Sequence, residues 1–171
     1  MVAISLPPIK PELVTASVDS REQTPFDLAP MMTERATLDV GDYSVKGLEH
    51  VVSIERKSLL DLVACCGRER ARFQRELDRL RGWPVSAVVV ESTWTTIESG
   101  SWKTPRMKMT PSHVLGSLTS WIAQGHTIIV APRPMAQRIT RSILCHAARH
   151  RVDEVRELVQ TFANLKAGAD A

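Results

Sequence analysis

Two acidic residues and a lysine have types and spacing that suit hydrolysis of a phosphate ester. Asp42 follows Gly41. After 12 intervening residues comes Glu55-Arg56-Lys57, directly behind a β-branched run that predicts a buried strand. Side chains alternate across a strand, so Glu55 and Lys57 lie on one face and Arg56 on the other. Burying an unpaired charge is costly, so a functional site explains these residues better than a core does.

The chemistry that these residue types favour needs a divalent cation and a phosphate. Two carboxylates held close together raise each other's pKa, whereas bound Mg²⁺ or Mn²⁺ lets both stay ionised. Asp42 and Glu55 are therefore the candidate metal ligands, and Lys57 is placed to hold or polarise the attacking water.

A longer string of motifs makes the pattern more specific. Gly41-Asp42, Glu55-Arg56-Lys57 and Asp61 together spell G-D-x(12)-E-R-K-x-x-x-D, and Val18-Asp19-Ser20-Arg21-Glu22 precedes them. This resembles the nuclease domain of the XPF and Hef family of structure-specific DNA endonucleases, which is restriction-endonuclease-like and belongs to the PD-(D/E)xK superfamily. The resemblance runs from about residue 14 to about residue 149.

The resemblance implies a metal-dependent cut in DNA near a branch or a single-strand junction, as in DNA repair or recombination. If Asp19 reaches the other carboxylates, it is a third metal ligand or orients them; otherwise it begins an Asx turn. Arg21 and Glu22 are expected to support the site. Arg56 is grouped with the catalytic residues as a brace that pairs with Glu22 or Asp61.

Asp61 also has a structural explanation. Ser58 to Asp61 forms a capping box ahead of an apolar run, with Ser58 as N-cap. Its place in the signature therefore does not make Asp61 catalytic, and we count it as a supporting residue.

Alternating strands and helices predict an α/β fold, and the resemblance specifies a mixed central sheet flanked by helices. Strands are expected over residues 13–19, 51–54, 85–90 and 127–131, with 36–40 as the strand that delivers Asp42. Helices are expected after Ser58, over 68–81, from Pro111 to Gly125 and after Pro134, while 93–110 reads as a loop.

The expected helix 68–81 has an apolar stripe and a separate basic one. Phe73, Leu77 and Leu80 form the first, and Arg68, Arg72, Arg75 and Arg79 form the second. Four arginines in one row favour contact with DNA phosphates. The alternative is a solvated face with Glu69 and Glu76 as surface partners.

The loop 93–110 combines Trp94 and Trp102 with the basic residues Lys103, Arg106 and Lys108. Such a loop could stack on unpaired bases, or its tryptophans could cover the core. The spacing of His146 and His150 would suit zinc, but no glutamate follows the first histidine, so surface positions are expected.

Composition is that of one globular domain with a basic balance. The chain has 171 residues, 43% hydrophobic and 24% charged, with a net charge of +3. We expect a flexible tail (1–12), the nuclease domain (13–150) and a C-terminal helix and tail (151–171). No apolar run suits a signal peptide or membrane span, and three cysteines form no disulfide framework. The expected location is the cytoplasm, on the nucleoid in a bacterium.

One departure from the family bears on substrate recognition. Family members commonly carry a C-terminal helix-hairpin-helix module, and the residues after Arg149 lack the glycine-containing hairpins that such a module needs. A homodimer formed through the last two helices, or a separate DNA-binding subunit, could provide the DNA contacts that this module makes in the family. The competing readings are a non-catalytic DNA-binding or scaffold partner and a sequence-specific restriction-type nuclease; intact Asp42, Glu55, Arg56 and Lys57 favour catalysis.

Overall fold

The structure, a computed structural model, describes residues 9–105 and 107–169. Its centre is a six-stranded mixed sheet in the order β2-β1-β3-β4-β5-β6. β3 runs antiparallel to β1 and β4, and the other neighbours are parallel. The strands are β1 (Thr15–Asp19), β2 (Met32–Ala36), β3 (Tyr43–Val45), β4 (Val52–Ser58), β5 (Val85–Glu91) and β6 (Ile128–Ala131).

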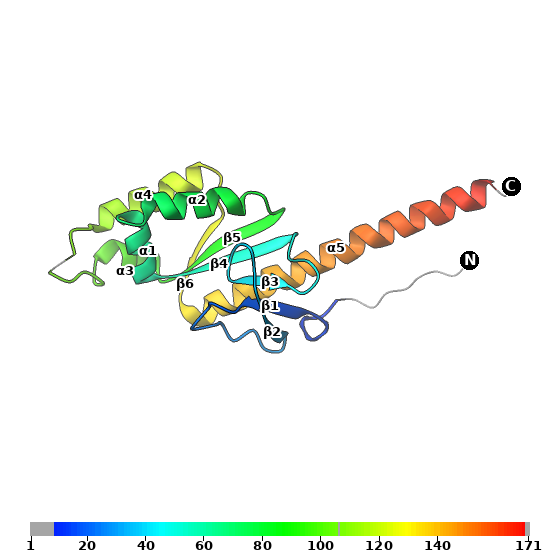
Figure 1. The fold of residues 1–171 in the computed structure, drawn as a ribbon, viewed down its shortest axis with the longest axis horizontal. Helices are drawn as coiled ribbons and strands as arrows, with labels where there is room; N and C mark the ends of the chain where they lie inside the picture. Colours follow the sequence, from blue (N-terminus) through cyan, green and yellow to red (C-terminus); the bar gives the residue numbers. More distant parts are fainter. Residues whose placement is uncertain (1–8, 106, 170–171) are drawn as a thin grey trace.

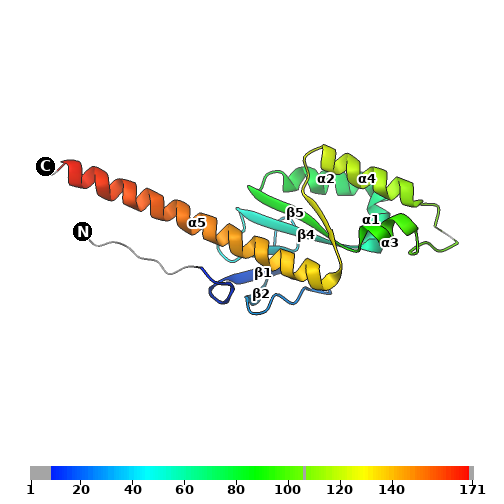
Figure 2. The same ribbon diagram turned by 180° about the vertical axis from the view of Figure 1, so that it is seen from behind.

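Helices cover both faces of this sheet, which confirms the predicted α/β fold (Figure 1). One face carries the shorter helices and the other carries α5, as the view from behind also shows (Figure 2). The helices are η1 (Pro11–Leu13, a 3₁₀ turn), α1 (Leu59–Cys66), α2 (Arg70–Leu80), α3 (Trp94–Ser99), α4 (Pro111–Ala123) and α5 (Arg133–Ala169).

Two hydrophobic clusters lie on the two faces of the sheet. In β5, Ala87 and Val89 pack with α5, whereas Val88 and Val90 pack with α1, α2 and α4. In β4, Ile54 belongs to the α5 side. Since side chains alternate, Arg56 projects on the α5 side, and its neighbours Glu55 and Lys57 project on the other side, as predicted.

Two predicted elements are wrong. Residues 36–40 do not form a strand: β2 ends at Ala36, and residues 37–42 form the connection to β3. The stretch 93–110 is not all loop, because Thr93 caps α3 by accepting a hydrogen bond from the Thr96 N–H, and Gly100 ends it with a positive φ.

The tryptophans of this region have different surroundings. Trp102 packs against the core beside α3, which agrees with a covering role, whereas Trp94 is 43% exposed. Arg106 lies outside the described residues, as do residues 1–8 of the predicted tail.

The last helix, α5, is longer than the sheet that it packs against. α5 begins against the sheet and extends beyond it in a single run to Ala169, so residue 150 lies inside the helix (Figure 1). Its distal part exposes apolar side chains, namely Val155, Leu158, Val159, Phe162 and Leu165. None of the helices in the described ranges has the length and hydropathy needed to cross a bilayer.

Candidate active site

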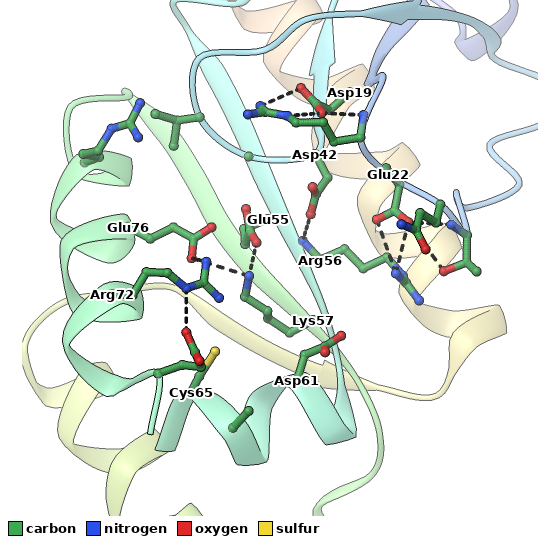
Figure 3. A pocket seen from close by; sticks show the side chains of 18 of the residues that line it. Asp19, Glu22, Asp42, Glu55, Arg56, Lys57, Asp61, Cys65, Arg72 and Glu76 are labelled. Atoms are coloured by element: carbon green, nitrogen blue, oxygen red, sulfur yellow. Dashed lines mark hydrogen bonds and ion pairs between the residues drawn. The ribbon is translucent and has the colours of Figure 1, made fainter. Parts of the chain in front are cut away.

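One cavity of about 760 Å³ gathers most of the predicted site residues. It lies between the loops after β1 and before β3 on one side and α1 and α2 on the other, with β4 between them (Figure 3). The predicted residues that line it are Asp19, Arg21, Glu22, Asp42, Glu55, Arg56, Lys57, Asp61, Arg68, Arg72 and Arg79.

Hydrogen bonds between the segment that contains Asp42 and strand β4 position Asp42 at the cavity. Gly41 adopts φ +78°, and a Cβ at this position would meet the Ile54 carbonyl oxygen at 3.0 Å. The Ser53 hydroxyl donates to the Val40 carbonyl at 2.8 Å, and the Asp42 N–H donates to the Ile54 carbonyl at 2.8 Å. These bonds place the Asp42 carboxylate against the second half of β4.

Glu55 and Lys57 form a buried ion pair on one face of β4. The side chains are only 6% and 10% exposed, and Lys57 Nζ donates to Glu55 Oε1. The same Nζ lies 5.2 Å from the centre of the Phe73 ring. Burial opposes the charge on Lys57, but the carboxylates of Glu55 and Glu76 outweigh it and raise the pKa of the ammonium.

Burial also perturbs the two candidate metal ligands. It raises the pKa of Asp42, and the hydrogen bond from the Arg56 N–H, at 2.7 Å, offsets only part of that effect. Burial together with the charge of Asp42 raises the pKa of Glu55, although Lys57 acts in the opposite direction. Both carboxylates would therefore be stabilised in their ionised form by a cation.

Arg56 lies on the opposite face of β4 and pairs with two carboxylates there. Its guanidinium contacts Glu22 at 3.2 Å and donates from Nε to Glu91. Arg133, at the start of α5, donates from Nη1 to both Glu91 oxygens at 2.9 Å and from Nη2 to the Pro25 carbonyl at 2.8 Å. The predicted contact with Glu22 is confirmed, whereas Glu91 and Arg133 were not predicted as its partners.

Asp61 does not serve as a partner of Arg56. Its backbone N–H donates to the Ser58 hydroxyl at 3.2 Å, and that hydroxyl lies 2.7 Å from the Asp61 carboxylate. The predicted N-cap at Ser58 is confirmed, with the Asp61 carboxylate bonded to the Ser58 hydroxyl, and Asp61 lines the cavity from the first turn of α1.

Asp19 is occupied by its own loop. Its Oδ1 accepts from the Arg21 N–H at 2.8 Å, which closes an Asx turn, and its Oδ2 accepts from the Leu38 N–H at 2.9 Å. The hydrogen bond from the Arg21 side chain is the main cause that lowers the pKa of Asp19 to about 2. Within the described residues no three His, Cys, Asp or Glu side chains converge to hold a metal ion, so Asp19 is not gathered with Asp42 and Glu55 into one ligand cluster.

Glu76 of α2 is a site residue that the sequence reading missed. Its Oε2 is shielded from solvent without a hydrogen bond, 3.5 Å from Lys57 Nζ and 3.9 Å from Arg72 Nη1 (Figure 3). On a helical wheel Glu76 falls between the arginine stripe and the apolar stripe. That boundary position between the two stripes is the signal that could have identified Glu76.

The four arginines that were predicted to contact DNA divide into two groups. Arg68, Arg72 and Arg79 line the cavity, whereas Arg75 is exposed and does not. Arg72 pairs with Glu69 at 2.9 Å, and Arg79 donates to the Asp39 carbonyl at 2.6 Å. Arg68 lies just before the helix begins and is largely exposed.

The donor set suits a hard cation. Mg²⁺ is typically bound by one or two carboxylates, with waters and substrate phosphate completing its octahedron. Asp42 and Glu55, both buried and both with a raised pKa, are the residues that could hold such an ion.

Comparisons with known proteins give matches among solved structures alone. No protein-family profile and no curated protein matches the chain. The chain is similar to XPF from Aeropyrum pernix, with 17% identity and a TM-score of 0.58 over 86% of this chain and 73% of that one. It is also similar to XPF from Aeropyrum pernix in complex with DNA, with 15% identity and a TM-score of 0.56 over 79% of this chain and 64% of that one. These likenesses show the fold.

Proposed function

We propose that this chain, which has the fold of XPF from Aeropyrum pernix, is a metal-dependent endonuclease that hydrolyses DNA phosphodiesters at branches or junctions. The observation that supports this most directly is the convergence of Asp42, Glu55 and Lys57 on one cavity, with the carboxylates buried and their pKa values raised. Perturbed ionisable groups that meet in a cavity are typical of catalytic sites.

In this proposal Asp42 and Glu55 hold Mg²⁺ or Mn²⁺. Such an ion, once bound, would act as a Lewis acid on the phosphate and lower the pKa of a coordinated water. The two carboxylates would hold it from fixed positions, because Glu55 belongs to β4 and Asp42 accepts a hydrogen bond from the Arg56 N–H of that strand. Asp19, held at the cavity wall by Arg21, is proposed to support the site from outside the set of direct ligands.

Lys57 is the proposed group that orients the attacking water or offsets the charge that develops on the phosphate. Its ammonium is held between Glu55 and Glu76, so it keeps a carboxylate partner when Glu55 is used as a ligand. Burial beside Phe73 restricts its movement.

The proposed DNA contacts come from the arginines at the cavity rim. Arg68, Arg72 and Arg79 line the opening, where guanidinium groups can bind phosphate oxygens in pairs. The DNA in the Aeropyrum pernix complex supports DNA as the ligand of this fold.

The alternative is a non-catalytic DNA-binding partner of a nuclease. One observation favours it: Glu55 is already paired with Lys57, and within the described residues no third acidic, His or Cys side chain completes a metal site. A functional test therefore has to separate binding from cutting.

The test is a panel of labelled flap, fork, nicked and linear duplex DNAs, each with Mg²⁺ or with a chelator. We expect Mg²⁺-dependent products from the branched substrates alone, and none from a Lys57→Ala variant that still binds them. Equal cutting of linear duplex would contradict junction specificity. Binding without products under all conditions would select the non-catalytic alternative.

A further inference from the structure

A second arginine-lined hollow lies along α5, apart from the site cavity. It is a groove of about 380 Å³ whose basic and hydroxyl side chains are Arg138, Arg141, Ser142, His146 and Arg149. We call it the α5 groove. Pro11 of η1 completes one wall, so the groove runs between the helix and the start of the described chain.

The α5 groove is lined by basic side chains and by no acidic side chain. None of the residues that line it is Asp or Glu, and the sequence has no acidic residue between Glu98 and Asp153. The site cavity differs, because Arg72 there pairs with Glu69 and Arg21 pairs with Asp19. An arginine cluster without carboxylates attracts an external anion.

Two of these arginines are fixed in place by the backbone of other segments. Arg141 donates from Nη1 to the Ala29 carbonyl, and Arg149 donates from Nε to the Ile9 carbonyl at 2.6 Å. Each of these bonds uses one of the five N–H donors of a guanidinium, which leaves the others for a ligand. Arg138 is exposed on the same side, and its one polar contact in the described structure is with Met135 Sδ.

We propose that the α5 groove binds the phosphate backbone of nucleic acid at a second position, outside the cavity that contains Glu55 and Lys57. The choice of DNA as the nucleic acid rests on the proposed function. Arg138 and Arg149 are 11 residues apart on one helix, which is about 16 Å at 1.5 Å per residue. Phosphates of one strand rise about 3.4 Å each, so the row spans several phosphates and suits a polymer better than a single anion.

The experiment measures DNA affinity without cutting. Full-length protein is titrated against a fluorescent fork DNA in a chelator over a series of salt concentrations. We expect Arg138→Gln to reduce the salt slope by about 1 and Arg138→Gln/Arg149→Gln to reduce it by about 2, since each lost phosphate contact removes about 0.9. The matched control is Arg151→Gln, which removes one charge from the same helix at a residue paired with Glu154.

A second measurement separates the groove from the catalytic site. With Mg²⁺ and a series of DNA concentrations that reaches saturation, the variants are expected to keep kcat and to raise KM. Arg149→Gln also removes a bond to Ile9, so its melting temperature is recorded, and Arg138→Gln serves as the variant without such a bond.

Three results would overturn the proposal: an unchanged slope for Arg138→Gln, an equal loss for Arg151→Gln, or tighter binding of an acidic peptide than of DNA in the groove. Failure of the nuclease proposal looks different. In that case the fork is bound with the expected slopes but is not cut by the wild-type protein.

Discussion

The two faces of β4 differ in whether their charges are balanced. On the α5 side, Arg56 meets Glu22 and Glu91, and Arg133 adds a second cation to Glu91. On the other side, Lys57 is a single buried cation near the carboxylates of Asp42, Glu55 and Glu76 (Figure 3). The first face is complete within the protein, whereas the second has an excess of negative charge. An ion pair network that is complete serves structure, and an incomplete one marks where a ligand belongs.

The largest expected effect of breaking the incomplete face is on cutting. Glu55→Gln keeps the shape but removes the negative charge that would hold the cation, so the single-turnover cleavage rate is expected to fall by about 10³-fold. Glu34→Gln is a control, because Glu34 pairs with Lys46 away from the cavity. A loss below tenfold would argue against Glu55 as a ligand.

Breaking the complete face is expected to affect folding first. Arg56→Ala leaves Glu22 buried without a cation and Glu91 with Arg133 alone, which should cost about 3 kcal/mol in the free energy of unfolding. Urea denaturation measures this. Lys57→Ala is the comparison, and it should cost less because Glu55 can take up a proton. A larger loss for Lys57→Ala would reverse the assignment of the two faces.

The imbalance also predicts a pH dependence in the absence of metal. The pKa values of Asp42 and Glu55 are raised by burial to about 6 and about 8. A group whose pKa is raised on folding contributes stability below its unfolded pKa and loses it as pH rises through the folded value. Metal-free protein should therefore lose stability as the pH rises from 5 to 9, with most of the loss complete once the pH has passed about 8.

Two comparisons sharpen that measurement. Glu55→Gln should flatten the decline, because one of the two titrating groups is absent. Mg²⁺ should raise the melting temperature of the wild-type protein at pH 8 more than that of Glu55→Gln. Equal pH profiles for the two proteins in a chelator would show that Glu55 is not the source of the imbalance.

Local patterns in the sequence predicted the site residues on one face of β4 better than the ion pairs on the other face. Alternation along the strand placed Glu55 and Lys57 on one face, and the motif string that begins at Gly41-Asp42 associated Asp42 with them; all three line one cavity. These patterns were not enough to give the route of residues 37–42, which depends on a hydrogen bond from Ser53, 13 residues away from Val40. A strand was predicted at residues 36–40 because it would deliver Asp42 beside the strand that contains Glu55, whereas long-range hydrogen bonds determine the path.

The partners of Arg56 were beyond local patterns for the same reason. Glu91 is 35 residues away from Arg56, and Arg133 is 42 residues away from Glu91. Only the packing of β5 and α5 beside β4 brings them together. Glu76 is an intermediate case, because its position between two stripes of α2 is visible in the sequence but the lysine it faces is not.

The smallest expected effect concerns that residue. Glu76→Gln removes a carboxylate that lies 3.5 Å from Lys57 Nζ, while Glu55 remains to hold the ammonium in the absence of metal. Cutting should therefore fall only about fivefold, in kcat and not in KM, because Lys57 loses its second partner when Glu55 holds the cation. Asp78→Asn removes the same charge from an exposed position of α2 and should change neither constant. An effect on KM alone would place Glu76 in DNA binding, and the excess charge on this face would then belong to Asp42 and Glu55.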